Sequence, residues 1–205
     1  MPKNYISNSE ESIRMFRSGW MEALSKVHYS VPLFIYIPAI IFFCYSAFSN
    51  GIGLTHFALY FILGLLIWTA TEYLVHRFIF HYYPDNSWGK RIHFIFHGVH
   101  HDYPKDKKRL VMPPSASIPL AALFYFIFSL LFTKAALFSF FPGFLLGYLL
   151  YDMMHYAMHH YNFKSGLFKR IKQHHMLHHY QDPTRGFGVS SSLWDELLRS
   201  QFPKK

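Results

Sequence analysis

The chain alternates long apolar stretches with polar segments that are rich in histidine. No Asp, Glu, Lys or Arg occurs between Lys26 and Glu72. A membrane-spanning helix needs roughly 20 apolar residues, so this stretch has room for two. The sequence "SNGIG" (49–53) interrupts it, and an Asn with two Gly residues favours a tight turn between antiparallel helices. The pattern therefore predicts spans at about 30–49 and 54–73.

A second uncharged stretch runs from Leu110 to Thr133 and predicts a third span at about 115–133. A fourth span, at about 135–152, is short and contains Pro142, which favours a tilt or a kink. Alternatively, these two segments together form a shallow re-entrant hairpin. With four spans, the sequence predicts an all-α integral membrane protein with a helical, histidine-rich cap built from residues 74–114 and 153–205.

Composition and charge agree with a membrane location. Of the 205 residues, enough for one domain, 52% are hydrophobic and only 15% are charged, against about a quarter in a soluble domain. With four spans, all 20 Lys and Arg residues except Lys134 lie on the side of the histidine-rich cap. The positive-inside rule makes that side the cytoplasm, at a bacterial inner membrane or the endoplasmic reticulum. The net charge of +9 then fits anionic lipid headgroups, and no nucleic acid partner is expected.

Residues 1–29 precede the first span and are expected to lie at the membrane interface. "SNSE" (7–10) has the spacing of a helix capping box. A helix from there would place apolar side chains on one face: Ile13, Phe16, Trp20, Leu24 and Val27. A disordered tail is the alternative. The single cysteine, Cys44, lies inside the first span and excludes disulfides.

Histidine is the residue type that carries the candidate chemistry. His28 and His56 stand alone and are interpreted as interfacial residues. The other thirteen of the fifteen form four clusters: His76 and His81; His93, His97, His100 and His101; His155, His159 and His160; and His174, His175, His178 and His179.

Their spacing predicts metal binding. Residues three and four apart share a helix face, so each of the last three clusters is expected to direct two or three imidazoles at one point. These sets are His97, His100 and His101; His155 and His159; and His175, His178 and His179. His76 and His81 are about 140° apart on a helix, so they are expected to serve two different metals unless the helix ends between them. Imidazoles suit Zn, Cu, Fe or Ni, and this number of them implies two ions.

The metal centre favours oxygen chemistry over the alternatives. The zinc-protease signature HEXXH is absent. Histidines of a transporter would lie within the spans, whereas these flank them, although a non-catalytic, histidine-rich metal transporter stays an alternative. Two redox-active ions beside lipid favour oxidation of an acyl chain with O2. Iron is the expected metal, because zinc cannot supply electrons, and zinc can replace it in purified protein.

Four segments resemble the fatty acid hydroxylase superfamily, which is sterol desaturase-like, over about residues 60–200: "EYLVHRFIFH", "HFIFHGVHHDYPKDKKRLVMPP", "YDMMHYAMHH" and "HHMLHHYQDPTRGFGVSSSLWDE". "RLVMPP" and "GFGVSS" narrow the resemblance to fatty acid 2-hydroxylases. It implies a di-iron monooxygenase that hydroxylates C2 of a fatty acyl chain, either free or in a sphingolipid or ceramide. The histidine clusters alone would also fit oxygenases that act on sterols, carotenoids or alkylglycerols.

The resemblance also implies which residues form the site. The ten metal ligands would be His76, His81, His97, His100, His101, His155, His159, His175, His178 and His179. Of the remaining histidines, His93 lies one turn before His97 and fits a partner that fixes a ligand's tautomer, whereas His160 and His174 would bond to nearby backbone. Three residues beside the ligands fit either outer positions of the site or core packing: Tyr73, Asp152 and Tyr156.

Substrate and electron supply remain open at this level. Four basic residues could hold a carboxylate or form an ordinary juxtamembrane cluster: Lys105, Lys107, Lys108 and Arg109. Four aromatic residues could line an acyl channel or pack the bundle: Phe78, Phe80, Phe94 and Phe96. Eukaryotic members of the resembled family often carry a cytochrome b5 domain, and about thirty residues before the first span are too few for one. A separate donor of the cytochrome b5, ferredoxin or reductase type is therefore expected.

Overall fold

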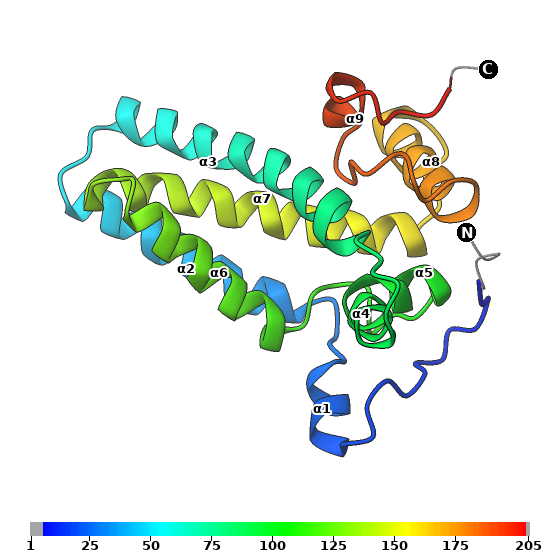
Figure 1. Cartoon of the computed structure of the whole chain (residues 1–205). Coiled ribbons are helices and arrows are strands. Elements are labelled where there is room, and N and C mark those ends of the chain that lie inside the picture. The colour runs from blue at the N-terminus through cyan, green and yellow to red at the C-terminus, as the bar shows by residue number, and fades with distance from the viewer. Residues whose placement is uncertain (1–5, 204–205) are drawn as a thin grey trace.

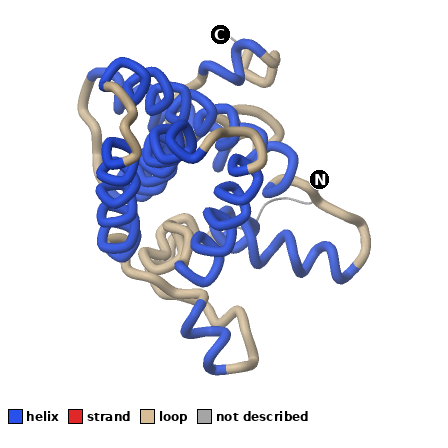
Figure 2. The backbone as a smooth tube through the Cα atoms, turned by 90° about the vertical axis from the view of Figure 1, so that its left-hand side faces the viewer, coloured by secondary structure: helices blue, strands red, loops and turns tan. Residues whose placement is uncertain are grey.

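The computed structural model describes residues 6–203, which form helices joined by loops and contain no strand (Figure 2). Four long helices form a bundle: α2 (Val31–Ser49), α3 (Leu54–Val75), α6 (Pro114–Ser129) and α7 (Lys134–His160). The α2–α3 and α6–α7 turns lie at one end of this bundle (Figure 1). The shorter elements lie at the other end: α1 (Gly19–Leu24), η1 (His76–Phe80), α4 (Ser87–His93), η2 (Phe94–Gly98), α5 (Val99–Asp102), α8 (Gly166–Tyr180) and α9 (Leu193–Leu197). The predicted all-α architecture with a histidine-rich cap is confirmed.

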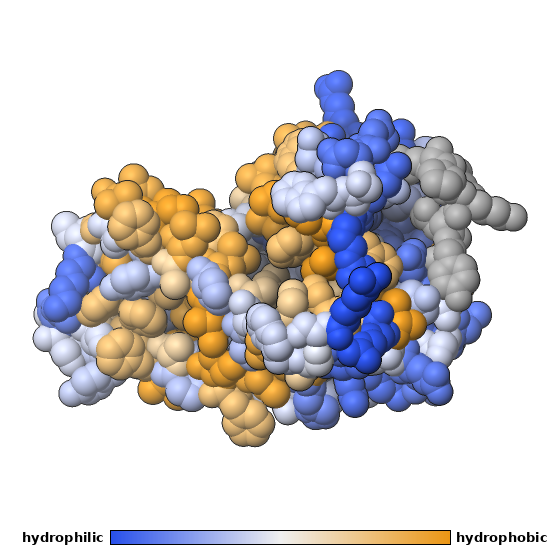
Figure 3. Space-filling view, turned by 60° about the horizontal axis from the view of Figure 1, so that its bottom comes forward, coloured by the Kyte–Doolittle hydropathy of each residue, from blue (hydrophilic) through white to orange (hydrophobic). Residues whose placement is uncertain are grey.

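Three helical segments are long and apolar enough to cross a membrane: Val31–Ser49, Leu54–Phe80 and Lys134–His160. The fourth, α6, has 16 residues, which at 1.5 Å each span about 24 Å, less than a hydrocarbon core of about 30 Å. Side chains such as Phe34, Leu59 and Phe126 are largely exposed around the bundle, and orange side chains dominate that half of Figure 3. These features indicate a multi-pass membrane protein, while the fourth span stays a prediction.

Helix α7 forms the centre of the bundle and connects it to the cap. It packs against α3 and α2, and most of its side chains are buried (Figure 1). It continues through Pro142 and past the predicted end at 152, because "MMHYAMHH" (153–160) contains no helix breaker. This extension carries His155 and His159 from the bundle into the cap.

Two glycines allow α3 and α7 to approach closely. A Cβ atom on Gly64 would collide with the carbonyl oxygen of Phe140, and one on Gly143 with that of Phe61. Small residues at such contacts let two membrane helices pack backbone against backbone. The resulting contact fixes the position of α3, which ends directly before His76, relative to α7.

The predicted N-terminal helix is wrong over most of its length. Only Gly19–Leu24 is helical, and residues 6–18 follow an irregular path across the cap. The buried guanidinium of Arg109 accounts for this, because it donates to the carbonyl of Ile13 and pairs with Glu22. The Glu22 carboxylate in turn accepts the N–H groups of residues 15 and 16, which a helix would have used itself. Residues 1–5 and 204–205, including Lys3, Lys204 and Lys205 of the charge count, lie outside the described residues.

Candidate metal centre

A π-helical turn brings His76 and His81 to the same point. The N–H of His81 donates to the carbonyl of His76, five residues earlier, at 3.2 Å. This wider turn replaces the 140° separation of an α-helix, and the two Nε2 atoms lie 3.3 Å apart. The expectation that these residues serve different metals is therefore wrong, and its alternative holds, because the helical segment ends at Phe80, between them.

The first histidine cluster collects side chains from η1, η2, α5 and α8. The Nε2 atom of His76 lies 3.0 Å from that of His97, which lies 2.9 Å from that of His101. His81 and His178 approach to 3.0 Å through the same atoms. The cluster consists of His76, His81, His97, His101 and His178.

The second cluster lies beside the first and takes its side chains from α5, α7 and α8. The Nε2 atoms of His100 and His155 are 2.9 Å apart, as are those of His159 and His175. The cluster consists of His100, His155, His159, His175 and His179. All ten predicted ligands are thus brought together in two groups of five.

The two groups divide the sequence clusters in a way that differs from the prediction. His97 and His101, four residues apart, point into the first group, whereas His100 between them points into the second. On α8, His178 joins the first group and leaves His175 and His179 in the second. Adjacent helical residues are about 100° apart, so a helix between two sites can serve both. The expectation that each sequence cluster converges on a single point is therefore wrong for these two.

The donor atoms fit two metal ions. Neighbouring ligands about 2.1 Å from an ion are about 3.0 Å apart in an octahedron and about 3.4 Å in a tetrahedron. The closest Nε2 atoms lie 2.9 to 3.3 Å apart, which is close to the octahedral value. Burial, and then the neighbouring imidazoles, lower the pKa of His97 and His101 well below the ordinary value. Burial likewise lowers the pKa of His178 to about 3. The imidazoles are therefore neutral at pH 7, and neutral imidazole is the form that binds a metal.

The C-terminal segment orients two histidines of the first cluster. The Nδ1–H of His76 donates to the carbonyl of Phe187 at 2.5 Å, and that of His178 to the carbonyl of Arg185 at 2.7 Å. Because a carbonyl only accepts, both Nδ1 atoms carry the proton and both Nε2 lone pairs face the cluster. Such partners commonly fix the tautomer of a metal-binding histidine. The sequence "GFGVSS" (186–191) therefore has a structural role at the site.

Two buried carboxylates at the site were not singled out in the sequence. Glu72 on α3 accepts hydrogen bonds from the 189–190 backbone, and Asp195 on α9 accepts them from the 187–188 backbone. A signal for Glu72 exists, because it is the only acidic residue between Lys26 and Asp85. An ionisable residue inside an apolar helix points to function by default. Asp195, in the polar C-terminal segment, gives no such signal.

Of the three residues predicted beside the ligands, two take part in hydrogen-bond networks and one serves core packing. The Tyr73 hydroxyl contacts Ser200 at 2.7 Å, and the Ser200 hydroxyl donates to Asp195, so Tyr73 belongs to the network around that carboxylate. Asp152 accepts the Tyr148 hydroxyl and the 112 N–H, which ties "RLVMPP" (109–114) to α7. Tyr156 stacks on Tyr29 and His160 and serves packing.

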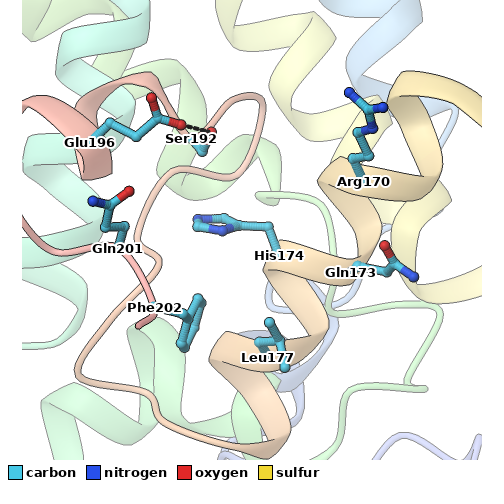
Figure 4. A pocket seen from close by; sticks show the side chains of 8 residues that line it. All are labelled: Arg170, Gln173, His174, Leu177, Ser192, Glu196, Gln201 and Phe202. Atoms are coloured by element: carbon cyan, nitrogen blue, oxygen red, sulfur yellow. Dashed lines mark hydrogen bonds between the residues drawn. The ribbon is translucent and has the colours of Figure 1, made fainter. Parts of the chain in front are cut away.

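None of the three remaining histidines joins a cluster. His93 packs against the ring of Tyr83 and, within the described chain, donates to no cluster histidine. The Nε2 of His160 is enclosed and has no hydrogen-bond partner among residues 6–203. The Nε2 of His174 lies 3.0 Å from the Asp195 carboxylate, so its expected backbone bond is replaced by a side-chain partner. A pocket of about 270 Å³ beside His174 contains no cluster histidine (Figure 4).

The structure also distinguishes among the basic and aromatic residues considered as substrate contacts. Arg109 is buried against the N-terminal segment and is unavailable to a substrate, while Lys107 pairs with Glu10 at the surface. Lys105 and Lys108 are exposed. Phe80 stacks on the His97 ring at 5.2 Å and is the only one of the four aromatic candidates that contacts a cluster histidine among the described ring pairs. The other three are exposed or half-buried: Phe78, Phe94 and Phe96.

Known proteins resemble this chain in sequence and in fold. The chain is 36% identical to the dihydroceramide fatty acyl 2-hydroxylase FAH1 of Arabidopsis thaliana over 91% of its own length and 79% of the relative's. It is 37% identical to the fatty acid 2-hydroxylase of Rattus norvegicus over 94% of this chain and 58% of that one. The solved structure of full-length scs7p, in which only the hydroxylase domain is visible, superposes with a TM-score of 0.84 at 34% identity, covering 90% of this chain and 70% of that chain. Residues 61–200 match the fatty acid hydroxylase family, and the chain belongs to that family.

Proposed function

We propose that this protein hydroxylates the α-carbon of a fatty acyl chain, in a ceramide or as a free acid, at a centre of two iron ions. The observation that carries the proposal is the pair of buried five-histidine clusters at one end of an apolar bundle. Similarity to enzymes named as fatty acid and dihydroceramide fatty acyl 2-hydroxylases supports the reaction and the substrate class.

The ten clustered histidines are the proposed ligands, five for each ion. Bound iron would supply the activation of O2 and the oxidation of the C–H bond. The chain holds the imidazoles neutral and directs their Nε2 lone pairs inward. It also encloses them, since seven of the ten side chains are buried: His76, His97, His100, His155, His175, His178 and His179.

The reaction requires electrons from outside. One atom of O2 enters the substrate as hydroxyl and the other leaves as water, so two electrons and two protons are consumed for each product. Histidine ligands cannot supply these electrons. We therefore include a separate electron donor of the cytochrome b5, ferredoxin or reductase type.

Membrane geometry supports attack beside the carbonyl. The elements that carry the clusters, such as α5 and α8, lie at one end of the bundle (Figure 1). In a membrane, that end would lie near the headgroup boundary of a lipid that runs alongside the bundle. A substrate with its polar head held there brings its first methylene group to the metals sooner than its tail, which is an effect of orientation. This proposal places the cap in the cytoplasm. Cysteines introduced at Asn50 and Lys107 of a Cys44→Ser protein should then be labelled from opposite faces, and labelling of both from one face would refute the arrangement.

The decisive experiment uses ¹⁸O2. The purified, iron-loaded protein, with reductant and ceramide in detergent or vesicles, should give a product that gains one labelled oxygen, and fragmentation should place that oxygen beside the carbonyl. A mid-chain double bond or an oxidised sterol would assign the chain to another reaction of the family. Metal uptake into vesicles without oxidised lipid would favour a transporter.

A further inference from the structure

Two carboxylates hold four consecutive backbone amides beside the first histidine cluster. The N–H groups of Phe187 and Gly188 donate to Asp195 at 2.9 and 2.8 Å. Those of Val189 and Ser190 donate to Glu72, both at 2.8 Å. Both carboxylates are buried, so these charge-assisted hydrogen bonds form away from water, where they are strongest.

One peptide group connects Asp195 to a proposed metal ligand. The peptide between Phe187 and Gly188 donates its N–H to Asp195 and accepts the Nδ1–H of His76 through its carbonyl. A carboxylate at the N–H end polarises the peptide and makes its carbonyl a better acceptor. The negative charge of Asp195 therefore reaches His76 through a single amide, much as a carboxylate in direct contact raises the basicity of a metal-binding histidine.

Glu72 holds the same loop from the opposite side. It lies on α3, one helical turn before His76, which begins η1 directly after α3, so one continuous helical segment carries both the ligand and the anchor of that ligand's partner. Ser190 also donates its hydroxyl to Glu72. A Cβ atom on Gly188 would collide with the carbonyl of Ser191, so the loop fits only with glycine at that position. The loop is therefore fixed by two charges and by tight packing.

The second cluster does not contact this clamped loop. Two of its histidines, His155 and His159, face the backbone carbonyls of Leu110 and Pro104. Within the described chain, the buried Nδ1 atoms of His100, His175 and His179 have no hydrogen-bond partner. These side chains are oriented by α5 and α8 and by contacts with other rings. The two sites thus differ in how their ligands are held.

We propose that Glu72 and Asp195 are positioning residues for the first metal site alone. By clamping the 187–190 backbone they fix the tautomer and direction of His76 and the basicity of its Nε2 atom, so the affinity of the first site for its ion depends on them. The affinity of the second site does not. This inference rests on the proposed di-metal centre but not on the identity of the substrate.

The test counts ions in the full-length protein purified in detergent. Wild-type protein should hold two. In competition with a chelator, Asp195→Asn and Glu72→Gln should each lower the affinity for one ion by roughly 10–100-fold, which is typical for loss of an outer partner of a metal ligand. The affinity for the other ion should be unchanged. Glu196→Gln is the matched control, because Glu196 is the neighbouring acid, is exposed, and among residues 6–203 its side chain bonds only to Ser192 (Figure 4).

A double variant assigns the weakened ion to a cluster. His175→Ala should remove the second-cluster ion, so His175→Ala with Asp195→Asn should hold neither ion at chelator concentrations at which each single variant keeps one. Cobalt(II) absorption spectra of the single variants should differ, because each would retain a different site.

Several outcomes would overturn the inference. Wild-type chelator resistance of both ions in Asp195→Asn and Glu72→Gln would do so, as would equal weakening of both ions in variants whose circular dichroism and thermal midpoint match those of the wild type. If Asp195→Asn does not fold, the near-isosteric Glu72→Gln decides alone. Fewer than two ions in the wild type would refute the di-metal centre instead, and a different lipid product would refute only the proposed reaction.

Discussion

In the bundle, α3 and α7 meet through glycines and aromatic rings, whereas the cap brings together imidazoles, carboxylates and backbone amides. Trp68 packs edge-on against Phe144 and Tyr148 in the bundle. In the cap, one loop directs its N–H groups at two carboxylates and its carbonyls at two histidines. The bundle is thus stabilised by close packing of complementary shapes, and the cap is stabilised by the pairing of polar groups.

This difference determines what each half tolerates. An apolar interface loses free energy roughly in proportion to the contact that is disturbed. A buried polar network fails more abruptly, because removing one partner leaves the other desolvated and unpaired. Substitutions in the cap should therefore affect metal binding and activity first, and those in the bundle should affect stability first.

The largest effect is expected from a cluster histidine. His100→Ala should lose the second-cluster ion and reduce product formation by more than about 100-fold, since a direct ligand contributes more than the outer partners, whose loss costs about 10–100-fold. Metal analysis and mass spectrometry of the lipid product measure both. His28→Ala and His56→Ala should keep two ions. Full metal content in both His100→Ala and His178→Ala would show that the ligand assignment is wrong.

A bundle substitution should instead reduce stability. Gly143→Leu places a side chain where the Phe61 carbonyl already lies, so α3 and α7 must separate at a cost of about 1–3 kcal/mol or more. The thermal midpoint in detergent should fall. Gly53→Ala is the control, because a Cβ atom there meets nothing within 4 Å. Equal midpoints for the two variants would contradict the close approach of these helices.

The N-terminal segment tests the polar contacts of the cap away from the metals. Arg109→Met removes the cation that pairs with Glu22 and Asp106, which leaves their carboxylates without it at a cost of about 3 kcal/mol. Thermal unfolding measures this loss. Lys107→Met breaks only the exposed pair with Glu10 and should leave the midpoint unchanged. A similar fall in both variants would mean that the charge of the cap, not the buried contact, determines stability.

The smallest effect concerns pH. Partial burial opposes ionisation of Glu22, but hydrogen bonds from Lys26 and the 15–16 backbone, with the charge of Arg109, lower its pKa from 4.5 to about 2. A lowered pKa means that its contribution is complete above pH 4.5 and is lost as the pH falls towards 2. Hydrogen exchange at the 15 and 16 amides, corrected for intrinsic rates, should show this loss of protection. A midpoint near pH 6 would assign the transition to histidines, and Glu22→Gln should lack it.

Hydropathy and histidine spacing predicted much of this protein because both depend on local rules. Uncharged stretches predicted α2, α3 and α7, and "SNGIG" (49–53) predicted the turn between the first two. Histidine spacing predicted metal binding, the resemblance to fatty acid hydroxylases implied the ten histidines, and the structure gathers all of them. The length of α7 was underestimated at 152, since a helix that leaves the membrane need not end there.

The prediction of an N-terminal helix was wrong because a contact distant in the sequence overrides the local signal. A capping box at 7–10 is a local signal, and it is overridden by the guanidinium of Arg109, which lies about a hundred residues further along the chain. That residue was itself interpreted as a possible substrate contact because burial is not visible in a sequence.

The sequence by itself therefore determined that the chain is an apolar helix bundle with enough imidazoles at one end to bind two metal ions. Only the tertiary structure decided how those imidazoles divide. The π-turn after α3 placed His76 and His81 together, and α5 and α8, lying between two sites, sent His100 and His178 to opposite clusters from their neighbours. It also brought Glu72 and Asp195, which are separated by more than a hundred residues, into contact with the same four-residue loop, 187–190. Helix periodicity fixes only the direction of a side chain about its own axis, whereas the partner in that direction depends on how helices far apart in the sequence pack.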